Sequence, residues 1–503
     1  MTTSRAIVIG ALLLAAGGGA AQPLDLSDPA ELVDAYVRTV GDTSGEESFV
    51  YASVVVLGIT PDEQGKKLFG LEVLGASRFV KIDGGYQRLH REVGLYTDLE
   101  TGDVLAGWTN PYLGRDVEVI HIQNDPVNFQ YTVAQQDTGR RILYDDFGSH
   151  IAFHREIPLR YPSPLDRAGY PRHSAGDWYV AAELFNSFAR RDELEDRSKT
   201  SVAEFGTWSR VGPWLPWMEM ADRPGHLLYH GRSTKLMSGP GELPPKVLQY
   251  IEANMPEYLH APTVMASPNQ TSWTYFKQVL DERRAAQGNG QHVLVFGGTG
   301  RTGIEIVRQL RARGADVTVF VRPTSDRAPL ESLGVAFVVG DAMSANDVRT
   351  AFTGRNVTAV VSAIGKRPQQ QVRPDYVANA NIVAAAKAAG VERLLQISSV
   401  GAGDSRQYLE TVPDFMVPVL EAKTNAESAL IDSDLRYTIL RPGRLYDGPA
   451  TGRGEASTDQ SIVNVGIRRS DLAELAVDVL FDAETAGNIL HVYDHSAAPA
   501  RRE

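Results

Sequence analysis

The pattern of hydrophobic and polar positions along the chain changes near residue 290. Residues 48–153 hold short segments rich in Val, Phe, Tyr and Leu, separated by Gly, Asp, Asn and Pro turns. Strands of this length with such punctuation predict an antiparallel sheet or barrel. The strands are expected at residues 49–57, 67–74, 86–96, 117–122, 129–133 and 151–153.

A more helical portion is expected after residue 153. Apolar side chains at positions 181, 184, 185 and 188 recur at helical spacing, which predicts a helix over residues 178–190. Another helix is expected over residues 273–286. The Gly/Asn-rich tract 287–290 that follows is typical of a domain boundary.

Beyond that tract, apolar segments of strand length alternate with segments of helical period. Such alternation predicts a doubly wound parallel sheet with helices on both faces. The strands are expected at residues 293–296, 317–321, 335–340, 357–364, 393–398, 436–440 and 489–493, and later helices at 378–389, 424–431 and 471–481.

The first of these strands leads into a glycine-rich turn with the spacing GxGxxG, and a helical pattern follows it. The glycines let the backbone turn tightly and approach a pyrophosphate, which binds at the N-terminus of the helix. This context predicts a dinucleotide-binding α/β domain of Rossmann type over residues 291–494. The expected cofactor-binding residues of the turn are Gly297, Gly298, Thr299, Gly300, Arg301, Thr302 and Gly303.

Arg322 directly follows the second strand of this unit. A carboxylate at such a position would bond the ribose 2′-hydroxyl of NAD, whereas an arginine accommodates the 2′-phosphate of NADP. NADP is therefore the expected cofactor and NAD the alternative. A solvated surface arginine is the competing interpretation of Arg322.

Further segments follow the glycine turn in a characteristic order: 321–322, 340–341, 362–365, 375–379, 398–401, Lys423 and 437–443. With the turn itself, they resemble the atypical short-chain dehydrogenase/reductase family, in particular its NmrA-like and biliverdin/flavin-reductase-like members. The resemblance implies that Asp341 lies beside the adenine. It also implies that Ser362, Ala363 and Gly365 line the cofactor.

One departure from this family bears on catalysis. Short-chain dehydrogenases use a tyrosine four residues before a lysine, whose charge lowers the phenol pKa. Lys423 is present, but Val419 takes the tyrosine position, so Ser398, Ser399 and Tyr408 are the remaining candidate donors. Reductase-like members imply hydride transfer, whereas NmrA-like members imply a module that binds dinucleotide without turnover. Both hypotheses stay open.

The first half of the chain carries a second resemblance, on segments 68–72, 91–98, 108–111, 121–128, 174–177 and 208–217. Over residues 28–262 these are similar to a bacterial family classed as a domain of unknown function, often preceded by a signal peptide. The likeness supplies no activity. The pattern of strands and helices in this half predicts an α+β, antiparallel β-rich domain.

Polar side chains of this half suggest a separate chemistry. His121 and Asp125 could act as the general base and orienting carboxylate of a hydrolase or lyase, whereas turn chemistry is the structural alternative. His90 and Glu92 share one strand face and are interpreted as a surface or interface pair. Arg210 and Arg223, which lie among the tryptophans, would suit a carboxylate- or phosphate-bearing substrate. No metal site is predicted.

Composition narrows the function classes. The net charge of −12 disfavours a nucleic-acid partner, and the absence of cysteine excludes disulfides and thiolate chemistry. Residues 1–21 have the charged, apolar and small-residue order of a secretory signal, too short to span a bilayer. We therefore expect a periplasmic or secreted protein without a membrane partner after signal removal. A cytoplasmic location is the alternative if the segment is not a signal.

The leading hypothesis is an exported NADP-dependent oxidoreductase acting on a small-molecule substrate, with an aromatic compound favoured by the tryptophans. The alternatives are a non-catalytic dinucleotide-binding module with a ligand- or partner-binding N-terminal domain, and the hydrolase or lyase. The sequence does not specify the oligomeric state. The predicted divisions are a signal at 1–21, a β-rich domain with a substrate pocket at 28–262, a helical linker at 263–290, the dinucleotide domain at 291–494 and a tail at 495–503.

Overall fold

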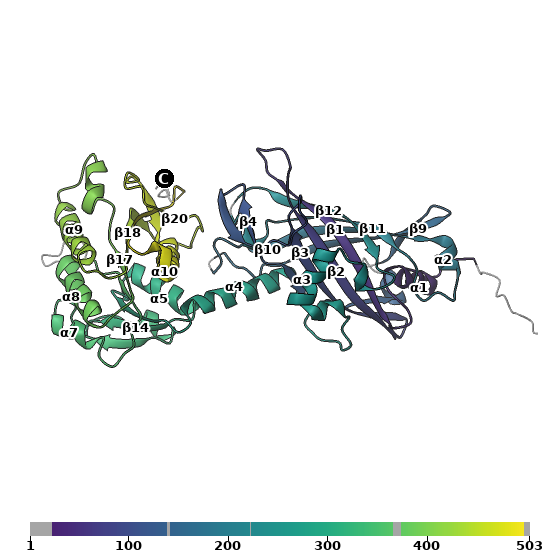
Figure 1. Cartoon of the computed structure of the whole chain (residues 1–503), viewed down its shortest axis with the longest axis horizontal. Helices are drawn as coiled ribbons and strands as arrows, with labels where there is room; N and C mark the ends of the chain where they lie inside the picture. Colours follow the sequence, from purple (N-terminus) through teal and green to yellow (C-terminus); the bar gives the residue numbers. More distant parts are fainter. Residues whose placement is uncertain (1–22, 138–140, 168, 222, 366–373, 497–503) are drawn as a thin grey trace, which may run out of the picture.

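The computed structural model holds two large sheets, with helix α4 (Ser272–Gly288) between them (Figure 1). The predicted signal segment lies outside the described residues. None of the helices in the described part of the chain is long and apolar enough to cross a membrane. The structure describes residues 23–137, 141–167, 169–221, 223–365 and 374–496.

The first sheet has ten strands and is antiparallel, which confirms the predicted β-rich class. Its strands lie in the order β6-β3-β2-β1-β12-β11-β10-β9-β8, and β7 also pairs with β3. The strand bounds are β1 Glu47–Ile59, β2 Lys66–Ile82, β3 Gly85–Thr97, β6 Ile122–Asn124, β7 Phe129–Thr132, β8 Leu143–Asp146, β9 His150–Pro162, β10 Trp178–Arg190, β11 Phe205–Gly212 and β12 His226–Lys235.

The sheet curves until strands from its two ends meet. The Arg155 guanidinium on β9 lies 5.7 Å from the ring of Phe129 and 5.3 Å from that of Tyr131, both on β7. Helix α1 (Pro29–Val40) packs at the same place, because its Tyr36 ring lies 5.3 Å from that of Tyr131. The concave face of the sheet therefore becomes an interior rather than an open surface.

The helix predicted over residues 178–190 is wrong, because this segment forms strand β10. It pairs with β9 along its whole length and with β11 over most of it. Glu183 and Phe185 face the interior, while Leu184 between them is 48% exposed. The apolar residues match helical spacing by coincidence, and the two neighbouring strands supply the hydrogen bonds that decide the conformation.

Shorter elements complete this half of the chain. Strands β4 and β5 pair as a separate two-stranded sheet. The bounds are β4 Gly107–Asn110, β5 Arg115–Glu118, η1 Val133–Asp137, α2 Arg191–Glu195, η2 Pro216–Met218, η3 Pro240–Glu242, α3 Pro245–Asn254 and η4 Pro256–Leu259.

Helix α4 occupies most of the predicted linker and is packed at both ends. Trp273, Phe276 and Leu280 are buried in the core of the first sheet. At the other end, the N–H of Gly288 donates to the carbonyl oxygen of Arg313. The segment is therefore a packed connection, and the predicted domain limits stay predictions.

The second sheet has the order β15-β14-β13-β16-β17-β18-β22-β20, and all its pairs are parallel except that of β20 with β22. Helices α5 and α10 cover one face, and α7, α8 and α9 cover the other. This confirms the Rossmann-type doubly wound sheet. The bounds are β13 His292–Phe296, α5 Arg301–Ala312, β14 Asp316–Val321, α6 Ala328–Glu331, β15 Ala336–Val339, α7 Ala345–Thr350, β16 Ala359–Ser362, α8 Pro374–Ala388, β17 Arg393–Ile397, η5 Gly403–Tyr408, α9 Val417–Ile431, β18 Tyr437–Pro442, β19 Arg444–Tyr446, β20 Glu455–Ser457, β21 Gly466–Arg468, α10 Arg469–Phe481, η6 Ala483–Thr485 and β22 Ile489–Tyr493.

Candidate functional site

The glycine-rich turn joins the end of β13 to α5. Gly297 has a φ of 80°, in the region that favours glycine. A Cβ on Gly303 would lie 2.2 Å from the carbonyl oxygen of Gly297. The tight turn itself therefore requires glycine at these two positions.

Gly300 is glycine for a different reason. It is the N-cap of α5, with φ −77° and ψ 159°, a conformation open to other residues. A Cβ there would meet only the carbonyl oxygen of Gly297, at 3.2 Å. No side chain caps α5, so its first N–H groups are available to an anion. The backbone therefore tolerates a side chain at position 300. A side chain there would, however, collide with a phosphate bound at the N-terminus of α5.

Two arginines surround this helix terminus. Arg301 Nη1 donates to Asp447 Oδ2 at 2.7 Å, and Arg469 Nη1 donates to the other oxygen of the same carboxylate at 2.6 Å. Thr299 and Thr302 lie half-buried in the same turn. The electrostatic setting of the turn is therefore positive, with Asp447 as an exchangeable partner.

The residues that follow β14 and β15, Arg322 and Asp341, differ in their contacts with the rest of the protein. Arg322 is exposed and belongs to none of the ion pairs among the described residues. Asp341 Oδ1 accepts a hydrogen bond from the N–H of Met343 at 3.0 Å, which is turn chemistry. Arg322 is thus available to a 2′-phosphate, while the placement of Asp341 beside the adenine stays a prediction.

The turn after β16 lies against the glycine turn. A Cβ on Gly297 would approach the carbonyl oxygen of Ala363 to 2.7 Å. Ser362 is buried and donates its hydroxyl to Asn379 Oδ1 at 2.5 Å, and Gly365 is exposed at the sheet edge. The structure therefore brings the residues predicted to line the cofactor together beside the turn.

A buried ion pair lies near this edge. Lys423 Nζ is 3.8 Å from Asp375 Oδ1 and donates to the carbonyl oxygen of Ile397 at 3.2 Å. Burial lowers the pKa of Lys423, against the charges of Asp375 and Glu427. Both carboxylate oxygens of Asp375 are buried without a hydrogen-bond partner among the described residues. Such orphaned acceptors fit the hydroxyl groups of a ligand.

The candidate proton donors are engaged unequally. The Ser398 hydroxyl donates to Glu427, and the Ser399 hydroxyl donates to the carbonyl oxygen of Val400 at 3.0 Å. Val419 is buried in the core and offers no polar group. Tyr408 is 45% exposed at the end of η5. Of these candidates, Tyr408 has the phenol that is open to a substrate, and its catalytic role stays a prediction.

The structure gives His121 and Asp125 separate partners. His121 Nδ1 accepts the N–H of Tyr96 at 3.1 Å, and burial lowers the pKa of this histidine to about 4. The Asp125 carboxylate pairs instead with Arg91 at 3.1 Å. His121 and Asp125 therefore do not form a base–carboxylate pair with each other among the described contacts, and their catalytic roles stay predictions.

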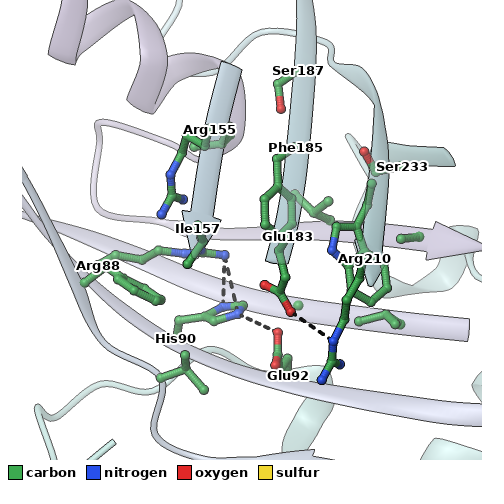
Figure 2. Close-up of a pocket in the computed structure, with 18 of the residues that line it drawn as sticks. Arg88, His90, Glu92, Arg155, Ile157, Glu183, Phe185, Ser187, Arg210 and Ser233 are labelled. Carbon is green, nitrogen blue, oxygen red and sulfur yellow. Dashed lines mark hydrogen bonds and ion pairs between the residues drawn. The ribbon is translucent and has the colours of Figure 1, made fainter. Parts of the chain in front are cut away.

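A cavity of about 260 Å³ lies on the concave face of the first sheet, and the sequence analysis missed it. Figure 2 shows charged side chains from four strands pointing into this space. The interpretation of His90 and Glu92 as a surface pair is wrong, because His90 is 4% exposed and lines this interior. The signal was their shared strand face, but only the curvature of the sheet places that face inside.

His90 makes stability depend on pH. Burial and the nearby Arg88 lower its pKa from 6.5 to about 4 in the folded protein. Between these values the unfolded chain binds more protons, so the free energy of unfolding falls as the pH drops from 6.5 to 4. We expect a loss of roughly 3 kcal/mol from this group.

The measurement is chemical denaturation across this pH range, comparing the native chain with His90→Gln. The variant should show a shallower slope, and the remaining slope comes from other groups such as His121, whose pKa is similarly lowered. An unchanged slope would contradict the assignment to His90.

No group of three or more His, Cys, Asp or Glu side chains within the described ranges could hold a metal ion.

Comparison with known families matches residues 45–280 to a protein of unknown function, DUF1838, and residues 297–483 to a family described as NAD(P)H-binding. Both resemblances predicted from the sequence are confirmed. The C-terminal half is a nicotinamide-dinucleotide-binding domain.

Three relatives illustrate the similarity, and each of them matches less than half of this chain. An uncharacterized chloroplastic protein of Arabidopsis thaliana is 29% identical over 243 residues, 46% of this chain and 87% of that protein. A 3-diazoavenalumate denitrifying reductase of Streptomyces is 32% identical over 180 residues, 32% of this chain and 58% of the reductase. The structure of an anaerobillin reductase from Escherichia coli O157:H7 is 28% identical and covers 42% of this chain and 100% of its own, with a TM-score of 0.37.

Proposed function

We propose that this chain is an NADP-dependent oxidoreductase that acts on a small molecule. The observation that carries the proposal is Gly300 at the uncapped start of α5, a glycine that the backbone does not need but a bound diphosphate does. The match to an NAD(P)H-binding family and the reductase among the relatives support the same class.

The residues around the turn fit this cofactor. The N–H groups at the start of α5 would hold the diphosphate, and Arg322 would pair with the 2′-phosphate. Asp375 and Lys423 would hold ribose hydroxyls, because the carboxylate has unused acceptors and the ammonium has a further donor.

When bound, the cofactor supplies or accepts a hydride at its nicotinamide ring. The chain then has to orient the substrate and exchange one proton with it. Tyr408 is the proposed donor, because Ser398 and Ser399 already commit their hydroxyl protons within the protein. Lys423 carries its charge at Nζ beside the ribose and so favours the ionised form of a nearby phenol.

The test is whether protein purified from its native compartment carries NADP(H), read by absorbance and mass spectrometry, and whether redox dyes or aromatic carbonyls turn it over. Bound cofactor with turnover supports the oxidoreductase. Bound cofactor without turnover of any acceptor favours the non-catalytic dinucleotide-binding module, for which Val419 in the tyrosine position is the motivating observation. A protein without measurable dinucleotide affinity overturns both.

Replacing Arg322 by alanine should reduce the affinity for NADPH by about 10- to 100-fold, since one charge-assisted bond to the 2′-phosphate is lost. The affinity for NADH, which lacks that phosphate, should stay unchanged. Titration of cofactor fluorescence measures both constants. An equal loss for the two cofactors would mean that Arg322 does not read the 2′-phosphate.

The proposal includes export to the periplasm or beyond. Its support is the order of charged, apolar and small residues in segment 1–21, which lies outside the described residues. N-terminal sequencing of the protein from its native host tests it, because removal of this segment is expected and an intact first residue would contradict export.

A further inference from the structure

The cavity inside the first sheet is built as a binding site. Its walls are mainly apolar and aromatic, and charged side chains from several strands point into it (Figure 2). Its volume of about 260 Å³ is slightly below the roughly 300–1,000 Å³ typical of small-molecule pockets. The apolar and aromatic lining includes Phe129, Ile157, Phe185 and Trp208.

Arginines and glutamates line the cavity in equal number: Arg88, Arg155 and Arg210, and Glu92, Glu183 and Glu204. Arg210 lies 3.6 Å from Glu183, so this pair is internally matched. The Glu204 carboxyl lies near the Lys235 ammonium, and burial raises the pKa of Glu204 to about 7.

Arg88 and Arg155 are the two lining arginines that belong to no ion pair among the described residues. Their hydrogen-bond partners carry no carboxylate: Arg88 Nε donates to the Ser77 hydroxyl at 2.9 Å, and Arg155 Nη1 donates to the Tyr131 hydroxyl at 2.9 Å. Figure 2 shows their guanidinium groups turned toward the same space. Burial would raise the pKa of Tyr131, yet these two arginines together hold it below its ordinary value. Two guanidinium groups that line one cavity and lack a carboxylate partner favour an anionic ligand there.

One further donor of the cavity lining lacks a partner. The indole N–H of Trp208 is buried and has no hydrogen bond among the described residues. A buried donor without an acceptor is unfavourable, so this group fits a ligand with acceptor oxygens.

We propose that this cavity binds a small organic monocarboxylate with an aromatic body, whose carboxylate lies between Arg88 and Arg155 and whose ring packs against Phe185 and Trp208. Guanidinium groups match the two oxygens of a carboxylate, and the aromatic walls exclude water around the ring. The site lies within the first sheet and does not rest on the proposed function of the dinucleotide domain.

The experiment uses calorimetry on the full chain without dinucleotide and three probes of one shape: 3-phenylpropanoate, 3-phenylpropan-1-ol and 3-phenylpropylamine. We expect the carboxylate to bind about 10- to 100-fold more tightly than the alcohol, and the amine not at all. Inorganic phosphate is a fourth probe. Equal binding of the three aromatic probes, no binding of the carboxylate, or tighter binding of phosphate would each overturn the proposal.

Two variants locate the binding site. Arg155→Gln and Arg88→Gln should each weaken the binding of 3-phenylpropanoate by at least about tenfold. The matched control is Arg160→Gln on the same strand, since Arg160 is exposed and stacks on Trp178 at 4.0 Å outside the cavity. Circular dichroism checks that each variant is folded. If one cavity variant unfolds, the proposal is tested by the affinity of the other variant and by the ranking of the probes on the native chain.

Discussion

Replacing Gly300 by aspartate is expected to abolish dinucleotide binding while leaving the C-terminal domain folded. The new side chain starts at the N-cap of α5, where φ and ψ are ordinary and only one backbone atom is close, at 3.2 Å. Aspartate is itself a favourable N-cap, so the helix keeps its stability. Its carboxylate, however, takes the place of the diphosphate on the helix N–H groups.

The expected loss of affinity follows from two like charges at close range. At about 4 Å and an effective dielectric constant of about 20, their repulsion is about 4 kcal/mol, which corresponds to roughly a 1,000-fold weaker binding. Titration of NADPH fluorescence measures the affinity, and thermal unfolding measures the stability.

Two matched controls separate the ligand from the backbone. Gly300→Ala adds a methyl group without charge and should bind NADPH far better than the aspartate variant. Gly303→Ala places its Cβ 2.2 Å from the carbonyl oxygen of Gly297, so this variant should lose stability as well. Retention of NADPH affinity within about fivefold in Gly300→Asp would show that the diphosphate does not bind at this turn.

The dinucleotide domain was predictable because its signals are local. The turn at Gly297 to Gly303 is contiguous in sequence, and the strands on both sides are apolar runs whose length and period are unambiguous. The sequence could also place Arg322 at a strand end, because in this fold the cofactor edge is the set of strand ends. The engagement of Ser398 by Glu427 was not predictable, since it joins different elements.

The first sheet shows the opposite case. Strand β10 was mistaken for a helix because Ala181, Leu184 and Phe185 satisfy a helical period, whereas the partners that make it a strand lie elsewhere in the chain. The cavity depends on the same long-range pairing. Arg88 and Arg155 come from β3 and β9, and only closure of the curved sheet brings them to one space. Their spacing along the chain therefore does not predict that the two arginines line one cavity.

Replacing Arg441 by methionine is expected to destabilise the C-terminal domain by about 3–5 kcal/mol. Arg441 and Glu427 are each 2% exposed, and the guanidinium donates to the two carboxylate oxygens at 2.7 and 3.1 Å. Arg441 also holds Asp404 at 2.5 Å, which ties η5 to the sheet. The variant leaves the Glu427 charge buried with the Ser398 hydroxyl as its remaining described donor, and that uncompensated charge is the main cost.

The distribution of tryptophan lets this effect be assigned to one half of the chain. All six tryptophans lie at or before Trp273, so their fluorescence reports the first sheet, whereas far-ultraviolet circular dichroism reports both halves. In urea, Arg441→Met should shift the dichroism transition to lower denaturant and leave the fluorescence transition in place. The double variant with Glu427→Gln should recover most of the loss, because it removes the buried charge. A double variant as unstable as the single one would mean that packing of the arginine, rather than its charge, holds this part of the domain together.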